Sequence, residues 1–440
     1  MEISSGDTAW MIVSTALVMF MTPGLALFYG GLVRGKNVLG TIMQSLFALG
    51  LVSIIWFVAG YTLAFGPSGN ALIGGLDFLF LRDVGAEPFA LAPTIPHSVY
   101  MAFQMMFAII TPALITGAVA ERMRFRGYVL FLLMWSLLVY SPVAHWVWGG
   151  GFLGLGDGNV GALDFAGGTV VHINAGVAAL AAIFYIGKRH GFGKEAIHPH
   201  NIPMVVTGAA ILWFGWFGFN AGSALASNGL AGAAFINTHL ATAAAMLGWL
   251  VVEWIRNKVP TTIGAATGAV GGLVAVTPAA GFVEPWAAVI IGLAAGMICY
   301  GAVSLKAKIS FDDSLDVVGV HMVGGLVGAL LTGIFATETI SGIDGANGLL
   351  YGNAAQLGKQ AIAVGVTIGY SFLATLFILK VTDLLVGVRV THEEELTGLD
   401  LSQHAETAYT TVDRGTVATP PVGAGSPSAS HSVVQRPAEG

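Results

Sequence analysis

The sequence predicts an all-α polytopic membrane protein with eleven transmembrane helices. Two observations support this prediction: 55% of the 440 residues are hydrophobic and only 10% are charged, and long apolar runs recur along most of the chain. Soluble domains usually carry about a quarter charged residues, so a water-soluble surface is excluded. Each run is long enough to cross a hydrocarbon core of about 30 Å as a helix. We therefore expect a multi-pass protein of the cell membrane.

Hydropathy and turn residues give the positions of the helices, with ends good to a few residues. The predicted spans are 9–32, 39–65, 97–120, 127–149, 166–187, 202–224, 232–255, 261–278, 283–305, 315–335 and 358–386. Many of the 61 glycines fall inside these runs. Small residues let membrane helices approach closely, so we expect tight packing.

The basic residues predict an orientation. Most fall on alternate loops, namely Arg34, Lys36, Arg122, Arg124, Arg126, Lys188, Arg189, Lys194, Arg256, Lys258, Lys306, Lys308 and Arg389; only Arg82 and Lys359 fall on the others. Cytoplasmic loops carry the excess of Lys and Arg. This pattern places the N-terminus outside and the C-terminus inside.

A short motif, Asp-x7-His-x3-Gly, occurs twice in the chain. The first copy begins at Asp164 and contains His172, and the second begins at Asp313 and contains His321. Five predicted spans separate the copies, and this odd number inverts the second relative to the first. We interpret the pattern as an inverted five-helix repeat followed by a final helix, with a functional site near the membrane midplane.

The two motif histidines, His172 and His321, lie well inside predicted spans, where ionisable groups usually line a water-accessible path. A lone histidine there is more often satisfied by a backbone carbonyl, but the repeat-related positions favour a shared role. Burial favours the neutral form, in which each ring has one donor and one acceptor nitrogen. Such a pair can line a narrow pore and relay a proton.

Three aromatic residues and one serine fall toward the outer or central part of spans: Phe107, Trp148, Phe219 and Ser223. Aromatic faces attract a small cation, and a hydroxyl oxygen accepts its hydrogen bond. Aromatic residues are also common in membrane cores and interfacial belts, so packing is the alternative for each. The acidic residues Asp164, Asp313 and Asp316 precede spans, where helix capping is the expected role; enrichment of cations is the alternative.

No cofactor or metal is predicted. Cys299 is the only cysteine, so no intrachain disulfide or thiolate cluster is possible. His198 and His200 flank Pro199 without a matching ligand cluster, and an ordinary loop is the better interpretation. Nucleic-acid binding has no support. An enzyme is not expected either, because the two motif histidines have no nucleophile or metal cluster beside them.

The composition changes after the last predicted span. We therefore divide the chain into a transmembrane domain, residues 1–388, and a cytoplasmic tail, residues 389–440. The tail begins as an acidic, amphipathic stretch and becomes rich in Gly, Pro and Ser from about residue 416. Such a composition predicts disorder for about residues 416–440.

Several segments carry a family resemblance. The run DFAGGTVVHINAGVAALAAIFYIGKR, Asp164–Arg189, resembles the signature segment of the ammonium transporter family, which includes the Rhesus-type proteins. Further similarities are AFQMMFA around Phe107, AHWVWGGG around Trp148, WFGFNAGSA around Ser223 and DDSLDVVGVHMVGG around His321. The resemblance covers about residues 10–410 and is closer to bacterial or archaeal members.

The resemblance implies a homotrimer with one pore in each subunit. Phe107, Trp148, Phe219 and Ser223 would then recruit ammonium outside, and the twin histidines would line a hydrophobic pore that conducts ammonia, with or without a relayed proton. A PII-type signalling protein would bind the cytoplasmic face and the tail. Thr267 stands where many members have serine, so its role stays open. The rival hypothesis is a membrane sensor whose tail reports ammonium to a cytoplasmic partner.

Overall fold

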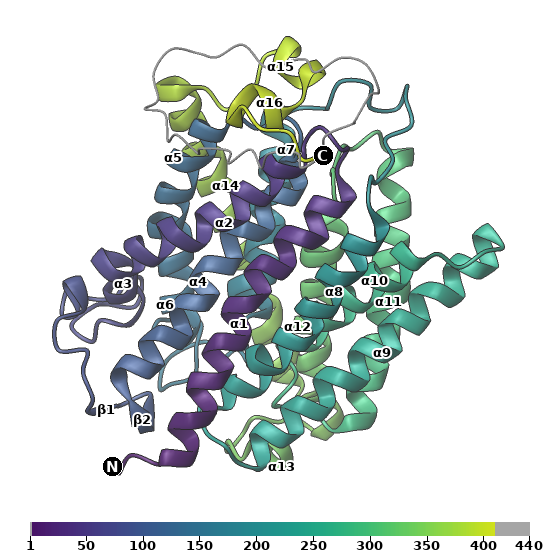
Figure 1. Cartoon of the computed structure of the whole chain (residues 1–440). Helices are drawn as coiled ribbons and strands as arrows, with labels where there is room; N and C mark the ends of the chain where they lie inside the picture. Colours follow the sequence, from purple (N-terminus) through teal and green to yellow (C-terminus); the bar gives the residue numbers. More distant parts are fainter. Residues whose placement is uncertain (1, 410–440) are drawn as a thin grey trace, which may run out of the picture. The chain divides into compact units, whose positions relative to one another are not determined.

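The computed structural model describes residues 2–409, which fold almost entirely as helices (Figure 1). Within these residues, ten helical segments are long and apolar enough to cross a membrane, and each predicted span overlaps an apolar helix. The predicted helical membrane fold is confirmed. The helix predicted at 261–278 is α10, Thr262–Val276, which measures about 22 Å at 1.5 Å per residue. It is shorter than the hydrocarbon core, so the count of eleven spans stays a prediction.

Sixteen α-helices follow one another along the described residues. They are α1 (Ser5–Leu32), α2 (Val38–Ile55), α3 (Tyr61–Phe65), α4 (His97–Val119), α5 (Phe125–Trp135), α6 (Ser141–Trp148), α7 (Asn174–Ile186), α8 (Ile202–Trp216), α9 (Gly229–Asn257), α10 (Thr262–Val276), α11 (Pro285–Lys308), α12 (Val323–Phe335), α13 (Glu338–Ser341), α14 (Ala354–Val386), α15 (His392–Thr397) and α16 (Leu399–His404). Two short antiparallel strands precede α4: β1 (Pro88–Phe89) and β2 (Ala92–Pro96).

Short turns of other helix types interrupt or extend the membrane helices. The π-helical turns are η1 (Trp56–Gly60), η3 (Ser136–Tyr140), η4 (Gly168–Ile173), η5 (Phe217–Ala221) and η7 (Val318–Met322). The 3₁₀ turns are η2 (Leu79–Leu81), η6 (Gly222–Ala224) and η8 (Leu349–Tyr351). Because π turns in helices concentrate at functional sites, the turns η4, η5 and η7 single out the centre of the bundle.

The glycines of the repeated motif bring two of these turns together. A Cβ atom on Gly176, in α7, would lie 2.4 Å from the backbone nitrogen of Met322 in η7. A Cβ atom on Gly325, in α12, would lie 2.9 Å from Cγ1 of Ile173 in η4. Small residues at both crossings therefore let α7 approach η7 and let α12 approach η4.

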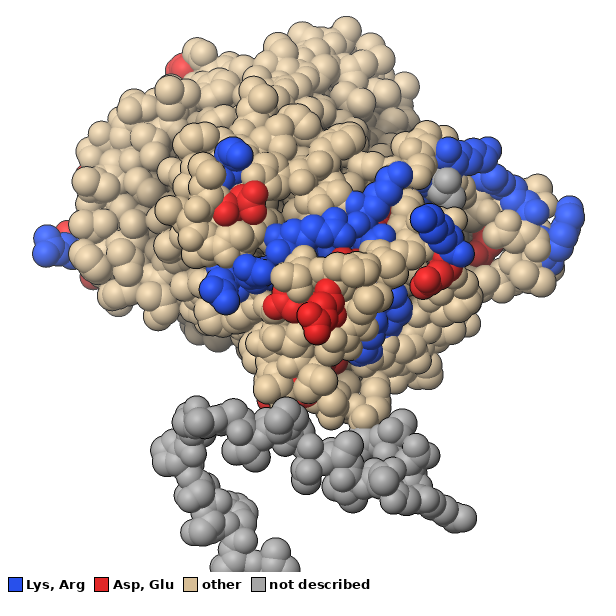
Figure 2. Space-filling model, turned by 90° about the horizontal axis from the view of Figure 1, so that it is seen from above, with Lys and Arg blue, Asp and Glu red and all other residues tan. Residues whose placement is uncertain are grey.

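The helical bundle has two opposite ends (Figure 1). The start of α1 lies at one end, which we call the N-terminal face, and α15 and α16 lie at the other, which we call the tail face. Figure 2 looks onto the tail face, where Lys and Arg side chains cross the surface with acidic side chains beside them. Charge therefore gathers at this face.

The beginning of the tail is packed on the membrane helices. Asp400, in α16, accepts a hydrogen bond from the Gly40 N–H at 2.8 Å, and the Leu399 N–H donates to Oδ1 of Asn37 at 2.8 Å. Residues 1–408 accordingly form one compact unit. The domain boundary after residue 388 stays a prediction, and the segment predicted to be disordered, 416–440, lies outside the described residues.

Candidate functional site

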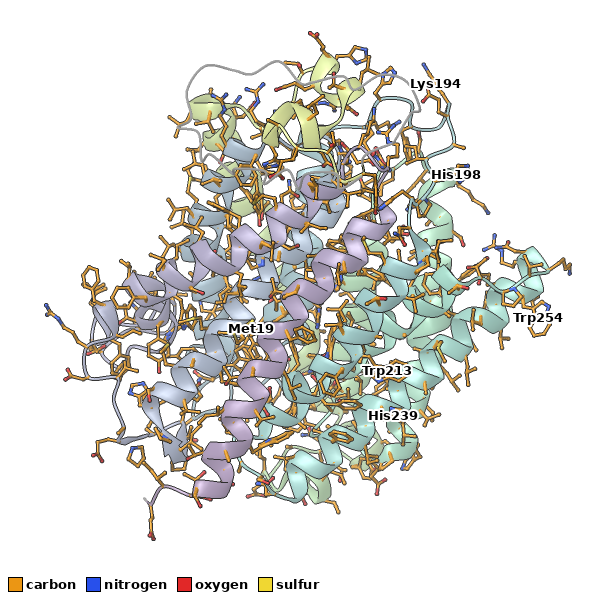
Figure 3. All side chains as sticks on the ribbon, in the orientation of Figure 1. Met19, Lys194, His198, Trp213, His239 and Trp254 are labelled. Carbon is orange, nitrogen blue, oxygen red and sulfur yellow. The ribbon has the colours of Figure 1, made fainter. Side chains whose placement is uncertain are left out.

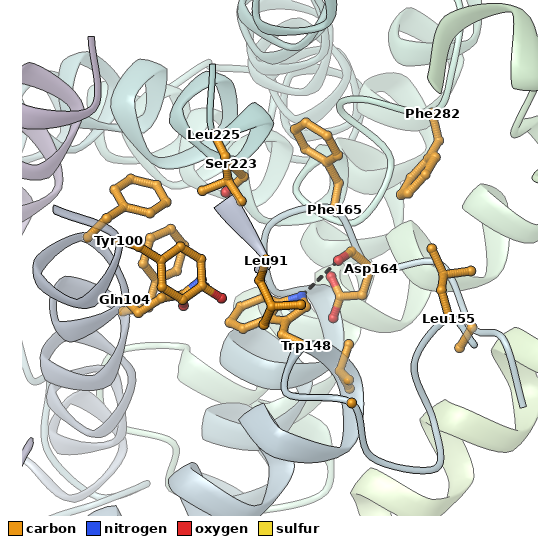
Figure 4. A pocket seen from close by; sticks show the side chains of 15 residues that line it. Leu91, Tyr100, Gln104, Trp148, Leu155, Asp164, Phe165, Ser223, Leu225 and Phe282 are labelled. Atoms are coloured by element: carbon orange, nitrogen blue, oxygen red, sulfur yellow. Dashed lines mark hydrogen bonds between the residues drawn. The ribbon is translucent and has the colours of Figure 1, made fainter. Parts of the chain in front are cut away.

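Figure 4 shows the lining of a cavity of about 290 Å³. Leu91, between β1 and β2, belongs to this lining, and both strands lie toward the N-terminal face (Figure 1). The walls of the cavity come from α4, α6, η6 and the loops that follow α6 and β1, so the tertiary fold assembles it. The lining residues include Tyr100, Gln104, Phe107, Trp148, Asp164 and Ser223. We call it the aromatic cavity.

Two hydrogen bonds fix polar groups in the wall of the aromatic cavity. Nε1 of Trp148 donates to the backbone oxygen of Asp164 at 3.0 Å, which holds the indole ring in place (Figure 4). The Ser223 hydroxyl donates to the backbone oxygen of Phe219 at 2.8 Å. Because this bond uses the hydroxyl hydrogen, the Ser223 oxygen keeps its lone pairs for a donor in the cavity.

A pair of phenyl rings lies next to the aromatic cavity. The rings of Phe107 and Phe219 have centroids 4.3 Å apart, and Phe107 also meets Trp148 edge-on at 5.9 Å. Both phenylalanines are fully buried. Phe107 lines the aromatic cavity, whereas Phe219 lines the next cavity along the bundle. The two rings therefore lie between the two cavities.

The next cavity, about 10 Å³, is lined by both motif histidines. A volume of this size holds about one water-sized molecule. Nδ1 of His172 and Nδ1 of His321 are 3.3 Å apart, and the rings are nearly parallel at 18°. Trp216 packs against His172 with ring centroids 5.3 Å apart. We call this space the histidine cavity.

The contact between the two Nδ1 atoms sets the protonation pattern of a neutral pair. A hydrogen bond between them requires one ring to donate from Nδ1 and the other to accept there. The donor ring then has an acceptor at Nε2, and the acceptor ring has a donor at Nε2. Among the described residues, Nε2 of His172 has no hydrogen-bond partner. The pair thus offers a small polar molecule one donor and one acceptor inside an apolar wall.

Both histidines stand on π-helical turns, His172 in η4 and His321 in η7, and an aspartate precedes each turn. The Asp164 carboxylate accepts hydrogen bonds from the N–H groups of Gly167, Gly168 and Thr169 at 2.6–2.8 Å. The related Asp313 carboxylate accepts from the Val317 and Val318 N–H groups at 3.0 and 2.7 Å. These bonds anchor the backbone that carries each histidine.

The third aspartate, Asp316, makes a different contact, because its carboxylate pairs with Nζ of Lys306. The neighbouring Asp313 is buried, and burial together with the negative charge of Asp316 raises the Asp313 pKa to about 6. The second copy of the motif therefore carries an additional charge pair at its start.

Two further cavities follow the histidine cavity toward the tail face. A cavity of about 30 Å³ is lined by His321, Thr267 and Asp316. It shares Leu315 and Asp316 with a basin of about 310 Å³, which Arg189 and Lys306 also line. Shared wall residues thus link the histidine cavity to the basin, whereas the Phe107 and Phe219 rings separate the histidine cavity from the aromatic cavity.

Buried charges support the rim of the basin. Arg189 bonds Asp312 at 2.7 Å and lies 3.3 Å from a Glu121 oxygen that also pairs with Arg34 at 2.7 Å. Burial alone would raise the pKa of Glu121, but Arg189 and Arg34 outweigh it and hold that pKa below its ordinary value. Arg189, which lines the basin, is therefore held in place by two carboxylates.

The predicted site residues divide into two neighbouring groups. Phe107, Trp148 and Ser223 line the aromatic cavity, whereas Phe219, His172 and His321 line the histidine cavity. Sequence reasoning missed Trp216 and Gln104, although Trp216 precedes Phe219 by one helical turn and so shares its face.

No metal group is assembled within residues 2–409: no three His, Cys, Asp or Glu side chains there are placed to hold an ion. His198 lies near Lys194 on the loop at the tail face (Figure 3). The Nδ1 atom of His200 lies 3.0 Å from the Val33 carbonyl oxygen, which accepts its hydrogen bond when Nδ1 is protonated.

Comparison with known proteins gives consistent matches. The model of the Ammonium Transporter Family matches residues 9–409. An ammonium transporter of Bacillus subtilis is 52% identical over 405 residues, covering 92% of this chain and 98% of the relative. Ammonium transporter Amt1 of Archaeoglobus fulgidus is 46% identical, covering 92% of this chain and all of the relative.

Solved structures match the fold of this chain as well. Mep2 of Candida albicans superposes with a TM-score of 0.84 at 38% identity, covering 89% of this chain and 88% of that one. A structure named Sensor Amt Protein superposes with a TM-score of 0.82 at 31% identity, covering 91% and 98%. The chain therefore belongs to the ammonium transporter family, a family of membrane transporters and not of enzymes, and it lies in the cell membrane.

Proposed function

We propose that this protein carries ammonium across the cell membrane as ammonia, with or without a relayed proton. The observation that carries the proposal is the paired His172 and His321, buried in an apolar cavity between the aromatic cavity and the basin. The ammonium transporters among its relatives support the choice of substrate.

Recruitment takes place in the aromatic cavity. The faces of Trp148 and Phe107 attract a small cation, and the Ser223 oxygen accepts one of its N–H groups. The Asp164 carboxylate is already occupied by backbone N–H groups, so it anchors the wall and leaves the cation to the rings.

Deprotonation follows at the phenyl pair. Desolvation in an apolar lumen costs a charged ion much more than it costs neutral ammonia. Ammonium therefore transfers its proton to water on the aromatic-cavity side, which becomes hydronium, and ammonia passes Phe107 and Phe219. Potassium cannot lose a proton and cannot donate hydrogen bonds, so it is rejected. Ammonia then passes along the histidine pair, which lines the histidine cavity and whose donor and acceptor nitrogens can relay the proton.

The orientation follows from charge. Lys and Arg side chains gather at the tail face, which supports a cytoplasmic tail and an N-terminus outside (Figure 2). The short helix α10 brings the number of spans to eleven. Together with the turn that follows it, α10 reaches across the full thickness of the membrane. In this arrangement the aromatic cavity opens outside and the basin opens to the cytoplasm, as uptake requires.

The test is charge movement in proteoliposomes after an ammonium jump, with potassium as the competing cation. The variant is His172→Ala with His321→Ala, and His239→Ala is the control, since His239 packs on Trp213 away from the cavities (Figure 3). We expect a selective current in the parent and in the control, and a lost or unselective current in the double variant. Equal conduction of potassium by the parent would refute the mechanism.

A sensor is the second candidate function, and the likeness to Sensor Amt Protein favours it. The acidic tail would then report ammonium to a PII-type partner, on a homotrimer with one pore in each subunit. Deleting residues from Thr391 onward and measuring both uptake and partner signalling separates the two hypotheses. Intact signalling without the tail would remove the sensor hypothesis.

A further inference from the structure

A charge pair stands where the proposed path leaves the protein. The Asp316 carboxylate pairs with Nζ of Lys306, and the same Nζ donates to the Asp313 backbone oxygen at 3.1 Å. Lys306 lies at the end of α11, whereas Asp316 lies in the turn before η7, so the fold creates the pair. Each side chain is about one quarter exposed, at 26% and 25%.

Asp316 lines three cavities, two of which lie on the proposed path, and Lys306 also lines the third, of about 230 Å³. Asp316 lines the 30 Å³ cavity beside His321 and also the 310 Å³ basin, and Lys306 lines the basin. A molecule that moves from His321 into the basin through these cavities therefore passes the carboxylate. Because the first cavity is so small, an ion held at Asp316 would obstruct it.

The partner of Asp316 has the chemistry of the substrate. The end of a lysine side chain is an ammonium group with three N–H donors, so Asp316 already binds an ammonium group that the chain itself supplies. An unpaired carboxylate would offer charge-assisted hydrogen bonds to a free ammonium ion in the same way. Lys306 and ammonium are thus competitors for one acceptor.

We propose that Lys306 is a built-in competitor that prevents Asp316 from retaining ammonium at the exit. This inference rests on the proposed function. Ammonia that leaves His321 takes one proton from a buffer acid in the basin, which becomes its conjugate base, and ammonium forms beside Asp316. While Lys306 holds the carboxylate, this ammonium diffuses away. Without Lys306, it binds there and slows the next molecule.

The experiment measures ammonium uptake into proteoliposomes preloaded with increasing ammonium, with orientation established by protease access to the C-terminal tail. Lys306→Met is the test variant, and Lys308→Met, on the same helix with an exposed side chain, is the control. We expect Lys306→Met to be half-inhibited at an internal ammonium concentration about tenfold lower than the parent, and Lys308→Met to match the parent.

Asp316→Asn in the Lys306→Met background should restore the behaviour of the parent, because the amide binds no cation strongly. Inhibition that persists in this double variant, or a Lys306→Met variant that matches the parent, would overturn the inference. A parent that takes up no ammonium would instead refute the proposed function. If Lys306→Met does not fold, Lys306→Ala carries the same test, since alanine also leaves the Asp316 carboxylate without the Lys306 donor.

Discussion

At the scale of single residues, Asp164 has the clearest energetic role. Its buried carboxylate accepts from three successive N–H groups at the start of η4. Asp164→Asn removes the charge and turns one acceptor oxygen into a donor that faces N–H groups. Since a hydrogen bond to a charged group is worth about 1.5–3 kcal/mol, we predict a loss of about 3 kcal/mol in unfolding free energy, measured as a lower melting temperature in detergent.

Asp157→Asn is the matched control for this prediction. Asp157 lies in the loop before Asp164, and its side chain is exposed. The control should melt with the parent, because exposed substitutions usually change stability by about 0.5 kcal/mol or less. An Asp164→Asn variant that also melts with the parent would show that the three bonds contribute little.

The hydroxyl of Ser223 gives a prediction about binding. Ser223→Ala removes one acceptor from the wall of the aromatic cavity and leaves the rings of Phe107 and Trp148 in place. A hydrogen bond of about 1 kcal/mol corresponds to roughly a fivefold higher half-saturating ammonium concentration. The maximal rate should stay near that of the parent, as measured by uptake in proteoliposomes.

Ser227→Ala is the control for Ser223, because Ser227 lies in the loop that follows η6 and its side chain is exposed. It should keep the half-saturating concentration of the parent. A Ser223→Ala variant with unchanged half-saturation and a reduced maximal rate would place the hydroxyl in a later step than recruitment.

At the scale of elements, the crossings at Gly176 and Gly325 determine how close the two histidine turns lie. A methyl group at Gly176 would come within 2.4 Å of a Met322 backbone atom, so Gly176→Ala must push α7 away from η7. Overpacking of this kind costs about 1–3 kcal/mol. We predict that Gly176→Ala lowers both the melting temperature and the uptake rate, and that Gly325→Ala does the same.

Gly232→Ala supplies the comparison. Gly232 lies in α9, and a Cβ atom there meets nothing within 4 Å. Alanine is about 1 kcal/mol better than glycine inside a helix, so this variant should be as stable as the parent or more stable. If all three alanine variants behaved alike, close helix approach at the repeated motif would not be needed.

The elements also show what sequence reasoning can reach. The apolar runs predicted the helices because a helix that crosses the hydrocarbon core needs apolar side chains. Each predicted span overlaps an apolar helix. The π turns η4, η5 and η7 were not predicted, because a single extra residue in a helical turn leaves no mark in hydropathy. The short strands before α4 were missed for a similar reason, since β1 has two residues and β2 has five.

The site was predictable only in part. The repeated motif linked His172 with His321 across 149 residues of chain, yet spacing cannot say that their Nδ1 atoms lie 3.3 Å apart. Ser223 and Trp148 share one cavity because η6 and α6 both border it, a tertiary arrangement without a local signal in the sequence. The pairing of Asp316 with Lys306 escaped prediction because capping is the usual role of an aspartate before a helix.

At the scale of the whole molecule, ion pairs at the tail face link loops from distant parts of the chain to one another. Glu121 follows α4, and its partners Arg34 and Arg189 follow α1 and α7. The folded-state pKa of Glu121 is lowered by these two arginines against the effect of burial. A carboxylate with a depressed pKa stabilises the fold above its unfolded pKa, about 4.3, and this contribution is lost as the pH falls through the folded value.

We therefore predict that the melting temperature in detergent falls as the pH drops below about 4.3 toward the lower folded-state pKa of Glu121, where protonation removes the carboxylate partner of Arg34 and leaves Arg189 with Asp312 alone. Glu121→Gln should lose stability already at pH 7, by about 1.5–3 kcal/mol, because charge-assisted hydrogen bonds are lost while Arg189 keeps Asp312. Its further loss on acidification should be smaller than that of the parent. Glu87→Gln, whose side chain is exposed, should follow the parent at every pH. If Glu121→Gln and the parent lost equal stability between pH 7 and a pH below the folded-state pKa of Glu121, acid sensitivity would arise elsewhere, and the loops at the basin would be held mainly by their packing.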